Sequence, residues 1–184
     1  LLLRNATAFG ASPRQRFDLV VNNLCGLAWT TGEVALTSDG TPWRPLVHAL
    51  DIVQAICLGL EAPRDAVHAQ VLNVGSDSQN YRVREIGEAV RAAFPGCGLS
   101  LGVEAGDTRS YRVCFDKIGR QLPGFRCAWG LPDGTRQFRT LFGHVGLTAR
   151  EFEDRGFSRL KQLEHLIRTA QIDEDFYWRT PGAS

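Results

Sequence analysis

Short apolar runs of strand length alternate with segments of helical periodicity along nearly the whole chain. The opening run, LLLRNATAF, and the later run AQVLNVG have the length and composition of buried strands. Between such runs, residues 15–30 place Phe17, Val20 and Leu24 on one face at spacings of three and four. This alternation predicts an α/β protein. We expect strands at 1–9, 33–37, 43–47, 69–75 and 99–104, and helices at 15–30, 52–60, 80–94, 116–122, 133–145 and 158–170.

Local signals refine several of these elements. Pro45 restricts the strand at 43–47 to an edge or an irregular position, because proline cannot donate to a sheet. Asp51, followed by Gln54, has the pattern of a helix N-cap with a capping box, and Thr148 with Glu151 repeats that pattern. No linker rich in Pro, Gly or Ser interrupts the chain, so we expect residues 1–184 to form one unit, with 173–184 as a loose tail.

Bulk composition excludes several classes of protein. The 184 residues carry a net charge of +1, which argues against a nucleic-acid partner or an anionic membrane surface. No apolar run is long enough to cross a bilayer, and no signal-peptide layout is present. The five cysteines are odd in number and form no C-x-x-C pair, so we expect reduced, mostly buried thiols in a cytoplasmic protein.

Known catalytic motifs are missing from the sequence. There is no G-x-G-x-x-G turn, Walker A loop, H-E-x-x-H or G-x-S-x-G motif, and the four histidines are too scattered to suggest a metal site. The lysines, Lys117 and Lys161, do not follow any tyrosine at the spacing Tyr-x-x-x-Lys. In that pair the lysine lowers the tyrosine pKa so that the tyrosine can exchange a proton. The chain therefore shows no catalytic residues of its own.

Five blocks in order, RNATAFG, NNL, SDGTPWRPLVHALDI, QVLNVG and DTRSYRVCFDKIGRQL, resemble the extended short-chain dehydrogenase/reductase family of NAD-dependent epimerases/dehydratases. The resemblance spans residues 1–125 and begins at the sixth strand of the family's Rossmann sheet. It implies the last part of a Rossmann-like NAD(P)-binding fold with a small α/β substrate-binding lobe, the N-terminal Rossmann half being absent. The start within an apolar strand, without methionine, also suggests a piece of a longer protein.

The resemblance assigns residues around the first strand. It places Asn5 and Ala6 beside the nicotinamide of the cofactor, through their backbone. The next position is typically an asparagine that contacts substrate, whereas this chain has Thr7. Threonine also donates and accepts hydrogen bonds, but with a shorter reach.

Two further elements are assigned to the nucleotide. In the NNL block, Asn23 and the backbone of Leu24 match positions that hold the diphosphate or the nucleotide. The strand EVALT resembles the one that seats the base, with Ala35 and Thr37 facing it on alternate positions.

Two arginines match the diphosphate ligands of the family. Arg44 ends the turn DGTPWR, which matches D-G-x-x-x-R, and Arg109 matches a second phosphate-binding arginine, with Arg112 close enough to substitute. A guanidinium makes forked hydrogen bonds to phosphate and keeps its charge at any working pH. Asp51 and Lys117 match structural positions.

The function implied is that of a nucleotide-sugar enzyme. The longer protein would act on a nucleoside-diphosphate hexose through transient oxidation at carbon 4, with NAD, or NADP, as cofactor, and would be a homodimer. This chain would supply substrate contacts without catalysis. Two alternatives stay open: a fragment of an NAD(P)H-dependent reductase of a non-sugar carbonyl, or a non-catalytic truncated product. The pair Arg44 and Arg109 favours the nucleotide-sugar reading, since such reductases generally lack both arginines.

Overall fold

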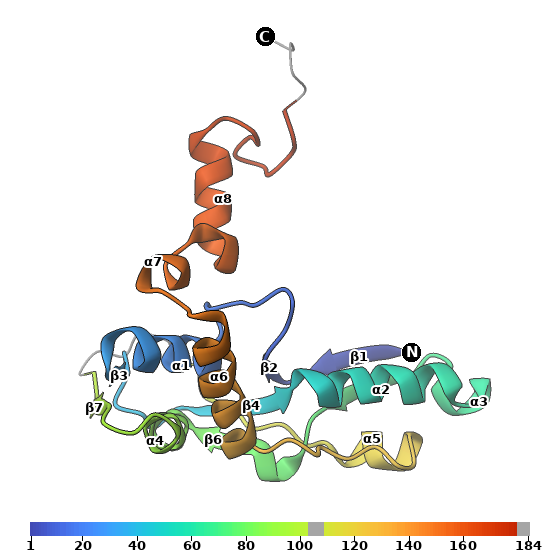
Figure 1. The fold of residues 1–184 in the computed structure, drawn as a ribbon. Coiled ribbons are helices and arrows are strands. Elements are labelled where there is room, and N and C mark those ends of the chain that lie inside the picture. The colour runs from blue at the N-terminus through green and yellow to red at the C-terminus, as the bar shows by residue number, and fades with distance from the viewer. Residues whose placement is uncertain (103–108, 180–184) are drawn as a thin grey trace.

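The computed structural model describes residues 1–102 and 109–179. Strands and helices alternate in a flattened body from which the C-terminal helix projects (Figure 1). The strands are β1 (Leu2–Asn5), β2 (Thr7–Phe9), β3 (Glu33–Ala35), β4 (Trp43–His48), β5 (Val71–Val74), β6 (Asn80–Arg82) and β7 (Gly98–Ser100). The helices are α1 (Val20–Thr31), α2 (Ala49–Glu61), α3 (Arg64–Val67), α4 (Val83–Ala93), α5 (Asp116–Gln121), α6 (Leu131–Val145), α7 (Ala149–Phe152) and α8 (Arg159–Arg168). The predicted α/β class is confirmed.

The first extended segment changes partners in the middle. β1 runs parallel to β5, and the amide of Ala6 continues that pairing by donating to the carbonyl of Val74 at 3.0 Å. From Thr7 onward β2 runs parallel to β4 instead. The segment is less buried than its sequence predicts, because Leu1 and Leu2 remain 46% and 53% exposed while Phe9 is buried. Thr7 therefore lies at the step between two sheets.

β4 is the central strand of a three-stranded sheet ordered β2-β4-β6, so Pro45 occupies an irregular position, the second of the two expected for it, and not an edge strand. The two neighbours pair with different halves of β4. β6 runs antiparallel to Trp43–Pro45, and β2 pairs with Leu46–His48. Pro45 lies where the pairing passes from one neighbour to the other, which is how a residue without an amide hydrogen fits inside the sheet.

Helix α1 begins at Val20, five residues later than predicted, because Phe17 is used in a tertiary contact. Its ring packs against Phe142, Phe152 and Phe157 with centroid distances of 4.9–6.0 Å, and its amide donates to the Phe157 carbonyl at 2.9 Å. Helix α4 likewise starts late, at Val83, because Asn80–Arg82 form β6.

The N-cap predicted for Asp51 is wrong. His48 caps α2, since its Nδ1 accepts from the Leu50 amide at 3.2 Å. Asp51 is buried in the first turn and accepts from the amides of Ala128 and Trp129 at 2.9 and 3.3 Å. Asp51 thus has a structural role, as the resemblance implies. It binds the backbone at Ala128, 77 residues away, and does not cap the helix.

His48 joins three parts of the fold. Its ring is buried, stacks on Trp129 at 4.4 Å, and its Nε2 lies 3.0 Å from Oε1 of Gln137. The same Gln137 oxygen accepts from the amide of Ala11, at the start of the loop that leads to α1. With Nδ1 accepting and Nε2 donating, only the neutral ring satisfies both bonds.

We expect stability to fall in mild acid because of His48. Burial lowers its pKa below the ordinary 6.5, against the opposing effects of Gln137, Asp51 and Asp133. The unfolded chain therefore takes up a proton at a higher pH than the folded chain does. The contribution of His48 to the free energy of unfolding is fully present above 6.5 and is lost as the pH falls below that value. Urea unfolding at about pH 7.5 and about pH 5.5 measures this loss. The loss should shrink in His48→Gln, and an equal loss in both proteins would contradict the assignment.

The two hydrophobic cores lie on either side of β4. The larger core joins α1, α4 and α6, with Val21, Ile86 and Phe138 among its buried members. The smaller one surrounds β5 and α5, with Leu72 and Ile118 buried. Val83, Ile86 and Val90 of α4 are buried in the larger core, and α6 packs on α1 and α4.

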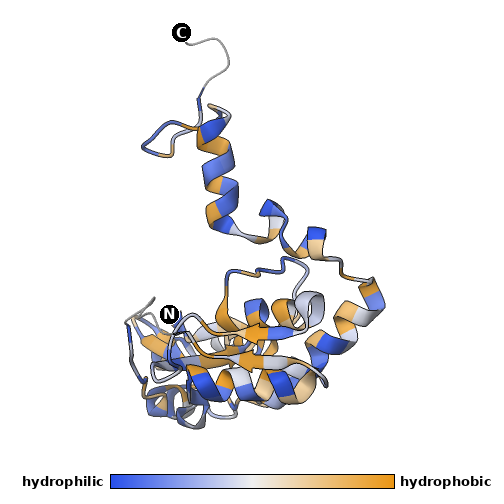
Figure 2. Cartoon of the chain, turned by 90° about the vertical axis from the view of Figure 1, so that its left-hand side faces the viewer, coloured by the Kyte–Doolittle hydropathy of each residue, from blue (hydrophilic) through white to orange (hydrophobic). Residues whose placement is uncertain are grey.

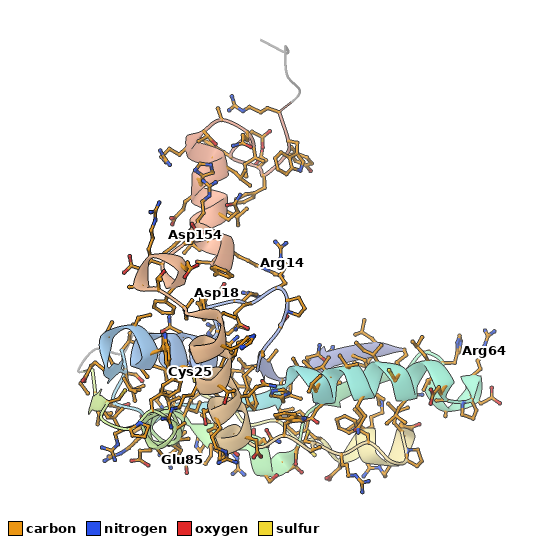
Figure 3. The ribbon with its side chains drawn as sticks, viewed as in Figure 1. Arg14, Asp18, Cys25, Arg64, Glu85 and Asp154 are labelled. Carbon is orange, nitrogen blue, oxygen red and sulfur yellow. The ribbon has the colours of Figure 1, made fainter. Side chains whose placement is uncertain are left out.

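Several peripheral expectations need correction. Of the five cysteines only Cys25 is buried, on α1 (Figure 3), where burial raises its pKa, and Cys57 and Cys114 are exposed. Within 173–179, part of the tail expected to be loose, the Asp173 carboxylate accepts from two amides, and Ile172 pairs with Trp178. Residues 180–184, and 103–104 of the strand expected at 99–104, lie outside the described part.

The capping box predicted at Thr148 and Glu151 is confirmed at the start of α7. Beyond it, α8 stands away from the body and carries both apolar and polar residues on its surface (Figure 2). Among the residues described, no helix combines the length and apolar character needed to cross a membrane.

Candidate functional site

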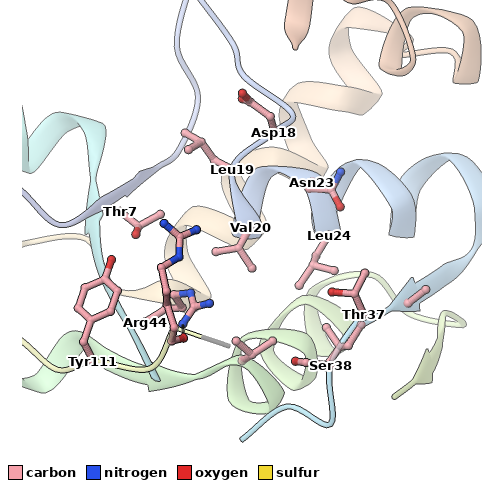
Figure 4. A pocket seen from close by; sticks show the side chains of 14 residues that line it. Thr7, Asp18, Leu19, Val20, Asn23, Leu24, Thr37, Ser38, Arg44 and Tyr111 are labelled. Carbon is pink, nitrogen blue, oxygen red and sulfur yellow. Dashed lines mark hydrogen bonds between the residues drawn. The ribbon is translucent and has the colours of Figure 1, made fainter. Parts of the chain in front are cut away.

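A pocket of about 450 Å³ opens between β2, α1, β3, β4 and the segment that begins at residue 109 (Figure 4). All six residues expected to bind substrate line it: Thr7, Asn23, Leu24, Thr37, Arg44 and Arg109. They come from five separate stretches of the chain. Their convergence is a result of the fold, since no two of these stretches adjoin in sequence.

Arg44 forms one side of the pocket. It projects from β4 and its Nη1 donates to the carbonyl of Trp43 at 2.9 Å and to the carbonyl of Arg109. The second bond fastens the exposed segment at 109 to the central sheet. Two arginines from distant segments thus border the same pocket, which suits an anion with more than one charge.

The first turn of α1 forms the roof. Leu19, Val20, Asn23 and Leu24 all line the pocket, and α1 has neither a side-chain N-cap bond nor an acidic residue in its first turn. The amide groups and the positive end of the helix dipole therefore favour an anion there. Asn22 turns inward, where its Nδ2 donates to the carbonyl of Arg16 at 2.9 Å, so the two asparagines of NNL have different roles.

Asp18 lies at the rim of this roof and was not expected from the sequence. Arg16 donates to both of its carboxylate oxygens, at 2.9 and 2.7 Å, and this bond holds the pKa of Asp18 below its ordinary value. The arginine offsets the negative charge that the carboxylate would otherwise bring to the entrance.

The opposite wall is formed by the end of β3 and the turn that follows it. Ala35 and Thr37 line the pocket, but so do Leu36 and Ser38, so the lining does not follow the expected alternation. Ser38 is buried, and its Oγ accepts from the amide of Gly40 at 3.3 Å. Figure 4 shows Thr37 and Ser38 across the pocket from Arg44 and Tyr111.

Tyr111 is another lining residue that the sequence did not predict. Its side chain lies near Thr7 and Arg44 in Figure 4, and its amide donates to the Trp43 carbonyl at 3.4 Å. The signal was available in principle, because in an extended segment residues two apart point to the same side, so a lining Arg109 implies a lining Tyr111. Arg112 is not in the pocket, and it stacks on Trp43 instead.

Asn5 and Ala6 precede the pocket on the same extended segment. Neither lines it, and the Ala6 amide is occupied by its bond to Val74. Asn5 is exposed at the end of β1, next to the step at which Thr7 enters the pocket. This position fits a nicotinamide contact through the Asn5 side chain or through carbonyl groups, but not through the amide of Ala6.

Comparison with known proteins supports the sequence resemblance. Residues 1–75 match the model of the NAD dependent epimerase/dehydratase family. Among solved structures, the NAD dependent NDP-hexosamine 5,6-dehydratase TunA of tunicamycin biosynthesis aligns with a TM-score of 0.65 at 20% identity, over 77% of this chain and 45% of that one. The UDP-glucose 4-epimerase of Thermotoga maritima, solved with UDP-glucose, aligns with a TM-score of 0.64 at 22% identity, over 79% and 46%.

A third structure, MoeE5 in complex with UDP-glucuronic acid and NAD, aligns with a TM-score of 0.58 at 26% identity, over 79% of this chain and 47% of that one. These matches confirm the predicted Rossmann-like α/β fold. The chain spans a little under half the length of each of these structures.

Proposed function

From the resemblance to the NAD-dependent epimerase/dehydratase family, confirmed by the family match over residues 1–75, we propose that this chain is the substrate-binding part of a nucleotide-sugar enzyme. The pocket would hold the nucleoside diphosphate of an NDP-hexose. The observation that carries the proposal is the meeting of Arg44, Arg109 and the first turn of α1 around one cavity.

Each wall of the pocket suits a different part of such a ligand. The diphosphate would lie between the two arginines and the amino-terminal end of α1, with the side chain of Asn23 beside it. The base would lie against Ala35 and Thr37, and the sugar would reach toward Thr7 and Tyr111, which offer hydroxyl groups to it. The pocket volume of about 450 Å³ falls within the usual range for small-molecule sites.

The chemistry of the complete enzyme would come from elsewhere. A bound NAD or NADP would accept and return hydride at carbon 4 of the hexose, and its nicotinamide would adjoin Asn5 and Ala6. The chain's own residues would bind and orient the sugar, since the sequence has no Tyr-x-x-x-Lys pair to move a proton. We propose a homodimeric, cytoplasmic enzyme on the same resemblance.

Calorimetric titration of the protein with UDP, dTDP and the corresponding monophosphates tests the proposal. At least one diphosphate should bind about tenfold more tightly than its monophosphate, because the second phosphate adds a charge-assisted contact. Binding should also weaken as salt is raised. If the longer protein binds no nucleoside diphosphate but does bind NADPH and a simple ketone, the chain belongs to a reductase of non-sugar carbonyls. If none of these ligands binds, the result favours the third hypothesis, a non-catalytic truncated product.

A further inference from the structure

Trp43 occupies the face of β4 opposite to Arg44, because neighbouring residues of a strand point to opposite sides. Two guanidinium groups lie over its half-buried indole ring. The carbon Cζ of Arg82 is 5.0 Å from the ring centroid, and Cζ of Arg112 is 4.9 Å from it. Both distances are within the range of a cation–π interaction.

The two arginines belong to different parts of the fold. Arg82 is in β6, where it is already paired with Trp43 in the strand register. Arg112 belongs to the segment 109–112, all of whose residues are exposed and which forms no strand or helix. The indole of Trp43 therefore contacts Arg82, which strand pairing holds in place, and Arg112, which belongs to no strand.

Segment 109–112 is attached to β4 at each of its four residues. Arg44 donates to the carbonyl of Arg109, the amide of Trp43 donates to Oγ of Ser110 at 3.1 Å, and the amide of Tyr111 donates to the carbonyl of Trp43 at 3.4 Å. Arg112 makes the fourth contact, with its guanidinium over the ring of Trp43. These hydrogen bonds are exposed to solvent, and the longest, from the Tyr111 amide, is weak. The contact between Arg112 and the indole is therefore important for holding the segment in place.

We propose that Trp43 is a positioning residue that, through Arg112, holds segment 109–112 so that Arg109 and Tyr111 reach the pocket. Trp43 does not line the pocket itself and acts on the ligand only through this segment. The inference rests on the proposed function for its ligand, a nucleoside diphosphate. It assigns a role to a ring that faces away from the site.

The matched pair Arg112→Gln and Arg82→Gln tests this role, with UDP or dTDP, whichever the wild-type protein binds, as the probe. Each variant removes one cation near 5 Å from the same ring. Arg112→Gln should weaken binding about three- to fivefold, the effect of one exposed cation–π contact, while Arg82→Gln should leave it within about twofold. Equal losses would mean a general electrostatic effect and would overturn the proposal.

Trp43→Ala should weaken binding at least as much as Arg112→Gln, and Trp43→Phe should restore most of it, since phenylalanine retains a ring face. In the Trp43→Ala background, Arg112→Gln should cost nothing further, because the two residues act as one unit. Full additivity of the two changes would contradict the inference. Thermal unfolding of each variant identifies any general loss of structure.

Amide hydrogen exchange supplies a measurement that needs no ligand. The amide of Tyr111 should exchange faster in Trp43→Ala and in Arg112→Gln, and at the wild-type rate in Arg82→Gln. Unchanged exchange in the first two variants would refute the positioning role even where the ligand binds. If the wild-type protein binds no nucleoside diphosphate but exchange changes as expected, the proposed function fails and the positioning of the segment stands.

Discussion

Replacing Arg44 by alanine is expected to weaken the binding of UDP or dTDP by about 10- to 100-fold, which corresponds to about 1.5–3 kcal/mol for a charge-assisted contact. The change removes a guanidinium from the pocket wall. It also removes the donor that holds the carbonyl of Arg109, so a second cation loses part of its support. The loss should therefore exceed that of Arg109→Ala. Calorimetric titration at fixed salt measures both.

Two control variants make the Arg44 result interpretable. Arg44→Lys keeps the positive charge but not the forked geometry, so it should recover only part of the affinity. Arg84→Ala removes an exposed arginine that pairs with Glu88 on α4, at 3.1 Å, and should change binding by less than about twofold if specific contacts outweigh net charge. Unchanged affinity in Arg44→Ala would remove the main assignment of the site.

The candidate site was largely predictable from the order of the sequence blocks. The resemblance named Arg44, Arg109 and Asn23 from three separate blocks and Thr37 from the strand EVALT, and the fold brings them to one pocket. Residue spacing alone does not predict this pocket, because nothing local in DGTPWR or DTRSYR indicates that the two segments lie next to each other in the fold. Their roles as ligands remain a proposal that the variants above test.

The residues missed at the site share a physical reason. Asp18 lies in a loop and is held by Arg16, and Tyr111 lies in a segment without regular structure. Asp18 falls within the helix expected at 15–30 but not on its apolar face, and Tyr111 falls in no expected element. Hydrophobic periodicity, the main signal available to sequence interpretation, therefore indicates neither residue. The alternation of Arg109 and Tyr111 was a usable signal only once the segment was known to be extended.

Errors in the fold have a similar origin in contacts distant in sequence. The N-cap pattern at Asp51 is a valid local signal, but the amides of Ala128 and Trp129 take up that carboxylate. The sequence left Pro45 with two possible positions, an edge or an irregular one, because a partner that changes along the strand cannot be read from one strand alone. Local rules therefore gave the class and order of the elements, while tertiary contacts decided their ends and neighbours.

Replacing Phe138 by alanine is expected to destabilise the protein by about 3–5 kcal/mol, the usual cost of emptying a large buried aromatic site. Phe138 lies in α6 with no exposed surface, and its ring is 5.4 Å from that of Phe142. The helix packs on α1 and α4, which provide the roof and one border of the pocket, so the damage should reach ligand binding as well.

The matched control for Phe138→Ala is Phe176→Ala, the same chemical change at a side chain that is 59% exposed. That variant should change stability by less than about 1 kcal/mol, since exposed positions rarely cost more. Urea unfolding of both variants gives the comparison, and a saturating nucleoside diphosphate should raise the midpoint of Phe138→Ala if the pocket still forms. Equal stabilities for the two variants would mean that α6 does not form part of the core. In that case the roof of the pocket would need another support, because α1 and α4 meet each other and α6 in one hydrophobic cluster.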